Sequence, residues 1–297
     1  MANKYYLKFY PMIVDSYGKF SRNRQKLASL IRLFRSLLKG GLIIVALLGC
    51  DDDPGNQERN VKEYTLVDQD DIEIHYFLSF PANFTKTDQY PLMIALHGGG
   101  IGDSLSGYRI LKAIFEPALE ETDFLIVTPK STARVGWEPV IGAGNIRTVI
   151  TDLQARYRID TTRIFVTGYS QGAIMAWQMV ESYPELFTGA IPVSGRYGFE
   201  AIPYDPRFDP IPPENAYPAA QFAAIIDVPF YVINSRLDLT FLFDIIHWQI
   251  EQLQEVGLDI TFHIVDDLDH SDVTGFIEHF QAALPWMEAV AADRSAE

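Results

Sequence analysis

Residues 163–177 read RIFVTGYSQGAIMAW, in which an apolar run meets a helix-forming run at the motif GYSQG. The β-branched and aromatic residues before the motif predict a strand, and the residues after it predict a largely buried helix. Gly-x-Ser-x-Gly between a strand and a helix is typical of a nucleophile elbow, a strained turn that lifts a serine hydroxyl above the sheet edge. Glycines on either side let the strand and the helix pack closely around the turn. The motif therefore predicts Ser170 as a nucleophile.

Short apolar runs alternate with longer helix-period runs along the rest of the chain. Strands are expected at 64–67, 72–80, 92–96, 124–127, 164–167, 189–193, 230–233 and 260–265, and helices at 105–119, 144–157, 171–183, 239–255 and 272–291. This alternation predicts an α/β fold with a mostly parallel sheet and helices on both faces. The first two strands have no helix between them, so we expect an antiparallel N-terminal hairpin that turns at residues 68–71.

A serine is a poor nucleophile until a base takes its proton, and the base needs a partner that orients it. His270 lies in the loop after the last predicted strand, at the edge where the carboxyl ends of parallel strands gather functional groups. The other candidates lie inside predicted elements, with His263 in a strand, His247 and His279 in helices and His75 on the hairpin. We therefore predict His270 as the base.

An acidic residue stands at the same edge of the predicted sheet. Asp238 follows the strand at 230–233, where a carboxylate can hold the imidazole in one tautomer and stabilise its protonated form. Capping of the next helix is the alternative role, because Asp caps helices well. Asp244, Asp266 and Asp269 compete for the assignment, but the first lies inside a predicted helix and the other two crowd the histidine loop. Asp238 is the predicted acid.

A glycine-rich loop, HGGG at residues 97–100, follows the third predicted strand. Glycines allow a substrate carbonyl to approach backbone N–H groups, so we predict an oxyanion hole formed by Gly99, Gly100 and Gln171. A plain glycine-rich turn is the alternative reading. We interpret His97 as a structural brace of this loop through a hydrogen bond to the backbone.

Two aromatic residues are candidates for contact with a substrate. Tyr169 directly precedes the predicted nucleophile, and Trp137 lies in a loop after the fourth predicted strand. Packing within the loop is the alternative for Trp137. We predict that both side chains line the site.

The N-terminal segment differs in charge from the rest of the chain. Residues 1–49 hold nine of the 24 Lys/Arg residues and one of the 39 Asp/Glu residues, a net charge of +8 that leaves −23 for residues 50–297. A basic region followed by GLIIVALLG, residues 41–49, has the order of a secretory signal and is short for a membrane span. Met12 or another downstream residue is an alternative start.

Cys50, the single cysteine, directly follows this apolar run, and LLGC at residues 47–50 resembles the lipobox of bacterial lipoproteins. The resemblance implies a removed signal at 1–49, lipidation of Cys50, an acidic tether at 50–60 and a folded domain at 61–297. A lipid-anchored protein of the bacterial cell envelope is expected, either periplasmic or exposed at the surface. The sequence leaves the sorting address open.

The composition argues against several classes of function. A strongly acidic domain does not favour nucleic acid or direct adsorption to anionic lipid, so any contact with a membrane is expected through the N-terminal anchor alone. Cys-x-x-Cys and His-Glu-x-x-His patterns do not occur in the sequence. We therefore expect neither a metal nor another cofactor.

Three phrases carry a family resemblance: YRIDTTRIF at 157–165, YPELF at 183–187 and PVSG at 192–195. With the GYSQG elbow, they resemble secreted esterases related to polyhydroxybutyrate depolymerases and feruloyl esterases. The resemblance implies the α/β-hydrolase fold and ester hydrolysis through an acyl-enzyme. Two positions depart from the family pattern. Asn145 stands where the family often has Asp, and Gln171, where Ala or Gly is more usual, is similar to the small carboxylesterases and acyl-protein thioesterases.

The residues and the resemblance together predict a serine esterase with the triad Ser170, Asp238 and His270. The expected substrates are feruloyl or acetyl esters on polysaccharide, or short hydroxyacid polyesters. A serine peptidase or acyltransferase with the same elbow is an alternative within enzymes. A non-catalytic envelope lipoprotein that binds a ligand is the alternative outside enzymes.

Overall fold

The computed structural model describes residues 59–68, 71–99, 105–131, 136–200, 202, 205 and 216–296. The expected signal, Cys50 and most of the acidic tether lie outside the described residues, as does Gly100. None of the helices in the described part of the chain has the length and apolar content that a membrane span requires.

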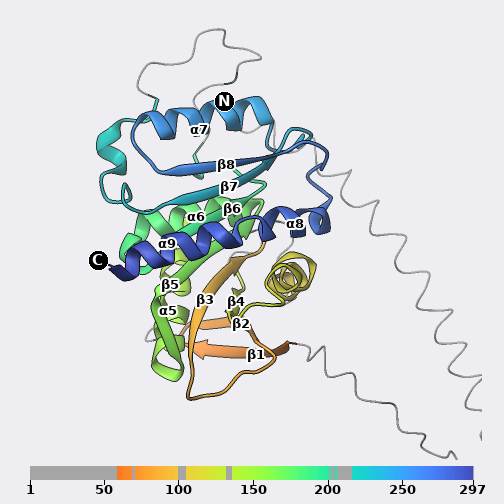
Figure 1. The fold of residues 1–297 in the computed structure, drawn as a ribbon, viewed down its shortest axis with the longest axis vertical. Helices are drawn as coiled ribbons and strands as arrows, with labels where there is room; N and C mark the ends of the chain where they lie inside the picture. The colour runs from red at the N-terminus through yellow and green to blue at the C-terminus, as the bar shows by residue number, and fades with distance from the viewer. Residues whose placement is uncertain are drawn as a thin grey trace, which may run out of the picture. The chain divides into compact units, whose positions relative to one another are not determined.

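Eight strands form one mixed sheet in the order β1-β2-β4-β3-β5-β6-β7-β8 (Figure 1). They are β1 (Asn60–Val67), β2 (Glu73–Phe80), β3 (Gln89–Leu96), β4 (Leu125–Pro129), β5 (Arg158–Tyr169), β6 (Gly189–Val193), β7 (Phe230–Ser235) and β8 (Ile260–Val265). Strand β2 pairs antiparallel with both β1 and β4, and all other pairs are parallel. The predicted fold class, strands and N-terminal hairpin are confirmed.

Helices cover both faces of the sheet. Successive side chains of a strand point to opposite faces, so each buried strand contributes to two apolar clusters. On β3, Leu92, Ile94 and Leu96 join one core cluster and Met93 and Ala95 join the other. The first cluster includes residues of α5 (Pro139–Arg156), α6 (Gln171–Ser182) and α7 (Phe243–Glu255), and the second those of α3 (Ser106–Ile110), α4 (Glu116–Ala118), α8 (Phe276–Gln281) and α9 (Leu284–Ala296).

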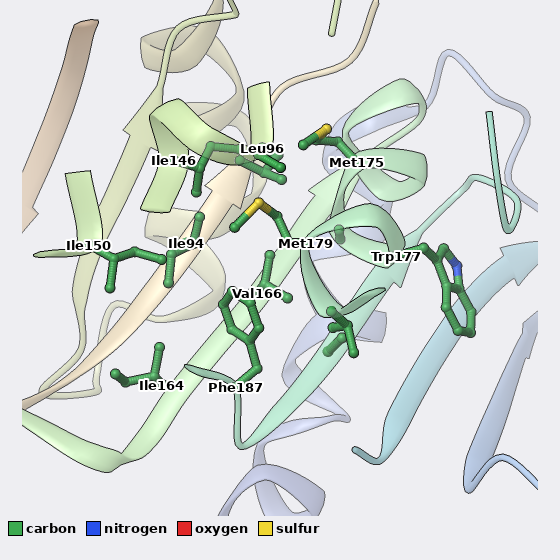
Figure 2. Packing of buried hydrophobic residues seen from close by; sticks show 14 of the residues in the cluster. Ile94, Leu96, Ile146, Ile150, Ile164, Val166, Met175, Trp177, Met179 and Phe187 are labelled. Carbon is green, nitrogen blue, oxygen red and sulfur yellow. The ribbon is translucent and has the colours of Figure 1, made fainter. Parts of the chain in front are cut away.

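Figure 2 shows part of the first cluster, with Ile94 and Val166 of the sheet facing Ile150 of α5 and Met179 of α6. These four side chains are at most 1% exposed. Burial of an aliphatic side chain of this size stabilises the fold by about 1.5–3 kcal/mol. The apolar runs found in the sequence thus become the contact between the central strands and the helices.

Two predicted helices are interrupted in the structure, each near a proline. The segment 105–119 contains α3, a π-helical turn at Leu111–Phe115 and α4, which holds Pro117. The segment 272–291 contains a short 3₁₀ turn, α8 and α9, and Pro285 is the second residue of α9. Proline has no N–H to donate within a helix and fits best in its first turn, so each helix restarts there.

Helix α6 lies directly against the sheet because glycines stand at the contact. A Cβ atom on Gly172 would lie 2.2 Å from the carbonyl oxygen of Leu96, and one on Gly168 would lie 2.2 Å from the carbonyl oxygen of Gly172. Real Cβ atoms do not approach backbone atoms so closely. The two glycines of the GYSQG motif therefore fix how near the start of α6 lies to β3 and β5.

Candidate active site

Ser170 occupies the turn between β5 and α6 with backbone angles of φ 59° and ψ −120°. A residue with a side chain pays about 1–3 kcal/mol in such a conformation, so the surrounding contacts must hold it there. The Ser170 N–H donates to the carbonyl of Val193 at 3.0 Å, and the Ser170 carbonyl accepts from Ala173 at 2.9 Å. These bonds tie the strained turn to β6 on one side and to the first turn of α6 on the other.

His270 lies in the loop after β8 and reaches the serine. Its Nε2 atom is 3.0 Å from Ser170 Oγ, and its Nδ1 atom is 2.8 Å from Asp238 Oδ2. The structure therefore brings together the three residues predicted as nucleophile, base and acid, from the loops after β5, β7 and β8. With Nδ1 protonated and facing the carboxylate, Nε2 is free to accept the serine proton.

Asp238 is 1% exposed and is surrounded by donors. Its Oδ1 atom accepts backbone N–H bonds from Thr240 and Phe241, both at 2.8 Å. Burial acts to raise the pKa of Asp238, but the hydrogen bond and charge of His270, with further donors, lower it below the ordinary 3.8. Asp238 thus orients the imidazole and holds the turn before α7. The alternative role of capping that helix is not the one it takes, because α7 begins at Phe243 with Leu242 at its N-cap.

The competing acidic residues are engaged elsewhere. Asp266 pairs with Arg236 at 2.8 Å, and Asp269 accepts bonds of 2.6 Å from the N–H and the hydroxyl of Ser271. Asp244 lies in the first turn of α7. Among these carboxylates, Asp238 alone is hydrogen-bonded to His270 in the described part of the chain.

Tyr169 packs against the loop that carries His270. Its hydroxyl donates to the backbone carbonyl of His270, and its ring centroid lies 5.5 Å from the imidazole. The side chain is 5% exposed. This corrects the expectation that Tyr169 lines the site as a substrate contact, because its polar end and most of its ring are used inside the protein.

The glycine-rich loop after β3 lies beside the nucleophile. A Cβ atom placed on Gly98 would lie 3.9 Å from Ser170 Oγ, and one on Gly99 would lie 2.8 Å from Gln171 Oε1. The loop and the first residue of α6 therefore flank the serine, where N–H groups can meet a developing oxyanion. Gly100, the third residue of the predicted oxyanion hole, lies outside the described residues.

Trp137 is buried behind this loop, at 5% exposure. Its indole N–H donates to the carbonyl of His97 at 2.8 Å, and the two rings lie 4.8 Å apart. His97 is also buried, and its Nε2 atom accepts the N–H of Ser131 at 3.1 Å. The expectation of an indole platform open to substrate is therefore wrong, because packing holds Trp137 against His97, which braces the loop.

One polar residue at the site was not singled out from the sequence. Ser194 follows β6 and is fully buried, with Oγ 2.7 Å from Asp238 Oδ2. The only sequence signal was its place in the phrase PVSG.

Within the residues that the structure describes, no group of three or more His, Cys, Asp or Glu side chains is placed to hold a metal ion.

The chain order and the topology now decide the architecture. A strained serine joins β5 to α6, an acid follows β7, a histidine follows β8, and all three meet at the carboxyl ends of neighbouring parallel strands. The chain has the α/β-hydrolase fold.

Known proteins with related sequences match this chain over limited segments. The family described as Phospholipase/Carboxylesterase matches residues 142–203, which include the elbow. Poly(3-hydroxyalkanoate) depolymerase C of Paucimonas lemoignei is 39% identical over 51 residues, covering 17% of this chain and 12% of that protein. Probable acetylxylan esterase A of Aspergillus terreus is 28% identical over 149 residues, covering 46% of this chain and 47% of that protein.

Among solved structures, a ferulic acid esterase superposes with a TM-score of 0.60 at 18% identity, covering 80% of this chain and 100% of that chain. This likeness supports the α/β-hydrolase fold. The chain spans less than half the length of the first curated relatives it matches.

Proposed function

We propose that this protein is a serine carboxylesterase. The observation that carries the proposal is the continuous hydrogen-bonded path from Ser170 Oγ through both nitrogens of His270 to Asp238, with distances of 3.0 and 2.8 Å. Both distances are within the range that proton transfer between a nucleophile and its base requires. The match of residues 142–203 to a carboxylesterase family supports the same chemistry.

The reaction has two halves. His270 Nε2 takes the proton from Ser170 as Oγ attacks the ester carbonyl, and the resulting oxyanion accepts bonds from N–H groups of Gln171 and the loop 97–100. The intermediate collapses, His270 gives its proton to the leaving alcohol, and an acyl-serine remains. Water then attacks the acyl-serine with His270 as base, which releases the carboxylic acid and restores the serine.

For the substrate, we propose acetyl or feruloyl esters on polysaccharide, or short hydroxyacid polyesters. The proposal draws on what the related proteins are named for: poly(3-hydroxyalkanoate), acetylxylan and ferulic acid esters. All three names refer to carboxylic esters. The shared chemistry is therefore ester cleavage, and the acyl group is the property to be measured.

For the location, we propose a lipid anchor on Cys50 and residence in the bacterial cell envelope. The support is the order of basic region, short apolar run and single cysteine in the sequence. Replacement Cys50→Ser is expected to release the protein from membranes in fractionation. Persistent membrane association of that variant would contradict lipidation at Cys50.

The test of activity uses the detergent-solubilised full chain with p-nitrophenyl acetate, butyrate and methyl ferulate, and with a fluorophosphonate probe that labels active serines. Turnover and labelling are both expected, and both are expected to disappear in Ser170→Ala at unchanged folding. Faster cleavage of matched amides, or preferred transfer to an added alcohol, would favour the peptidase or acyltransferase alternative. A protein without turnover or labelling would support the non-catalytic alternative.

A further inference from the structure

Two serines stand side by side at the ends of β5 and β6. The parallel register pairs Tyr169 with Val193, so Ser170 and Ser194 are the next residues of adjacent strands. Both have positive φ, 59° for Ser170 and 50° for Ser194. A positive φ therefore occurs at both serines, and Ser194 is fully buried.

The backbone fixes where the second serine points. Its N–H donates to the carbonyl of Ile233 at 2.7 Å, which ties it to β7, the strand that precedes Asp238. A Cβ atom on the next residue, Gly195, would lie 2.8 Å from the carbonyl oxygen of Ser170, so the segment after Ser194 lies against the elbow. Ser194 is thus held between the turn of the nucleophile and the strand of the acid.

The hydroxyl of Ser194 meets the two groups that control the base. Its Oγ atom lies 2.7 Å from Asp238 Oδ2 and 3.1 Å from His270 Nδ1, and those two atoms are themselves 2.8 Å apart. An ionised carboxylate only accepts, so the Ser194 O–H donates to Oδ2. The lone pairs of Oγ then remain available to the Nδ1–H of His270.

The choice of serine at this position needs a reason. Glycine adopts a positive φ without strain, whereas a residue with a Cβ is strained in that conformation, and a buried hydroxyl needs a hydrogen-bond partner. A serine here therefore costs stability through its backbone. The gain is a hydroxyl that is bonded to the acid and directed at the base.

We propose that Ser194 is a positioning residue of the proton relay, a role that rests on the esterase function proposed above. Its O–H prevents Asp238 Oδ2 from rotating away, and its Oγ keeps the Nδ1–H edge of His270 turned inward. The Nε2 atom consequently stays directed at Ser170.

The test compares Ser194→Gly and Ser194→Ala with the wild type. Both lose the hydroxyl, but glycine relaxes the positive φ and alanine does not. We expect both to lower kcat about tenfold, the effect of one hydrogen bond to a charged group, with KM within twofold. The rate of fluorophosphonate labelling of Ser170 is expected to fall by a similar factor in both, while Ser194→Gly unfolds at a urea concentration no lower than the wild type.

Three measurements make the outcome decisive. Ser182→Ala removes an exposed serine hydroxyl of α6 and is expected to leave kcat and the labelling rate unchanged. In an Asp238→Asn background, Ser194→Gly is expected to cost less than twofold, because the acid that it positions is gone. The rate of fluorophosphonate labelling of Ser170 reports the relay without an ester substrate, so it separates a failure of this role from a failure of the esterase proposal.

Two results would overturn the role of Ser194. One is a Ser194→Gly variant with the kcat and labelling rate of the wild type. The other is a loss of activity that occurs in Ser194→Ala alone and follows its lower stability, since that pattern requires only a structural serine.

Discussion

The backbone strain at Ser170 predicts that the best residue for folding at this position differs from the residue needed for chemistry. Ser170→Ala keeps the Cβ atom at φ 59°, whereas Ser170→Gly removes it. Both variants lose the hydroxyl, so neither is expected to turn over ester. Their difference in stability isolates the strain.

The magnitude follows from two opposing effects. A positive φ costs a residue with a Cβ about 2 kcal/mol. Glycine loses about 0.5–1 kcal/mol relative to alanine, because its unfolded chain is more flexible. Ser170→Gly is therefore expected to be more stable than Ser170→Ala by about 1 kcal/mol, which corresponds to a midpoint about 2–4 °C higher in a domain of this size.

The assay is urea unfolding of the full chain followed by circular dichroism, with thermal melts in parallel. The matched control is the same pair of substitutions at Ser182, near the C-terminal end of α6. There the order reverses, with Ser182→Ala more stable than Ser182→Gly by up to about 1 kcal/mol. Equal stabilities at Ser170, or a less stable glycine variant, would refute strain at the elbow.

Three further predictions concern residues around the site and the sheet. The buried Arg59 guanidinium donates to a serine hydroxyl and three backbone carbonyls. Arg59→Met is therefore expected to lower the free energy of unfolding by about 3 kcal/mol in urea titrations, and a loss below about 1 kcal/mol would contradict these bonds. Gly99→Ala places a Cβ atom 2.8 Å from Gln171 Oε1, so ester turnover is expected to fall about tenfold. Turnover is expected to recover largely when Gln171→Ala is added, and a double variant no faster than the single one would exclude this clash. Burial and the charge of a neighbouring histidine lower the pKa of His263 below its ordinary 6.5. The unfolded chain therefore binds more protons than the folded one, and stability falls as the pH drops below 6.5. His263→Gln is expected to flatten that dependence in melts from pH 7.5 to 5, and an unchanged slope would exclude His263 as its source.

The sequence predicted much of the fold because the relevant signals are local. Period-two and continuous apolar runs mark the strands, and the GYSQG motif marks the single turn that must be strained. Asp238 and His270 were found from their positions after predicted strands. Parallel strands bring their carboxyl ends to one edge, so residues far apart in the chain meet there.

The features that were missed depend on neighbours that no local pattern reveals. An aromatic residue beside the nucleophile looks the same in sequence whether it is open or buried, and the burial of Tyr169 and Trp137 comes from the histidine loop and from His97. Ser194 contacts the acid only because β6 is aligned with β5 on one side and joined to β7 on the other. Strand register was not predicted, so its role was not visible.

The position of β8 in the sheet has a consequence for thermal inactivation of the protein. Strand β5, which leads into the nucleophile, lies in the interior of the sheet, whereas β8 lies at its edge and, among the strands that the structure describes, pairs with β7 alone (Figure 1). Edge elements detach more readily than interior ones, and His270 is attached to this edge. On gradual heating, the proton relay is therefore expected to come apart while most of the sheet is still intact. The lifetime of the active protein at high temperature would then depend on how firmly the edge strand β8 is attached, so stabilising β8 is the direct route to prolonging activity.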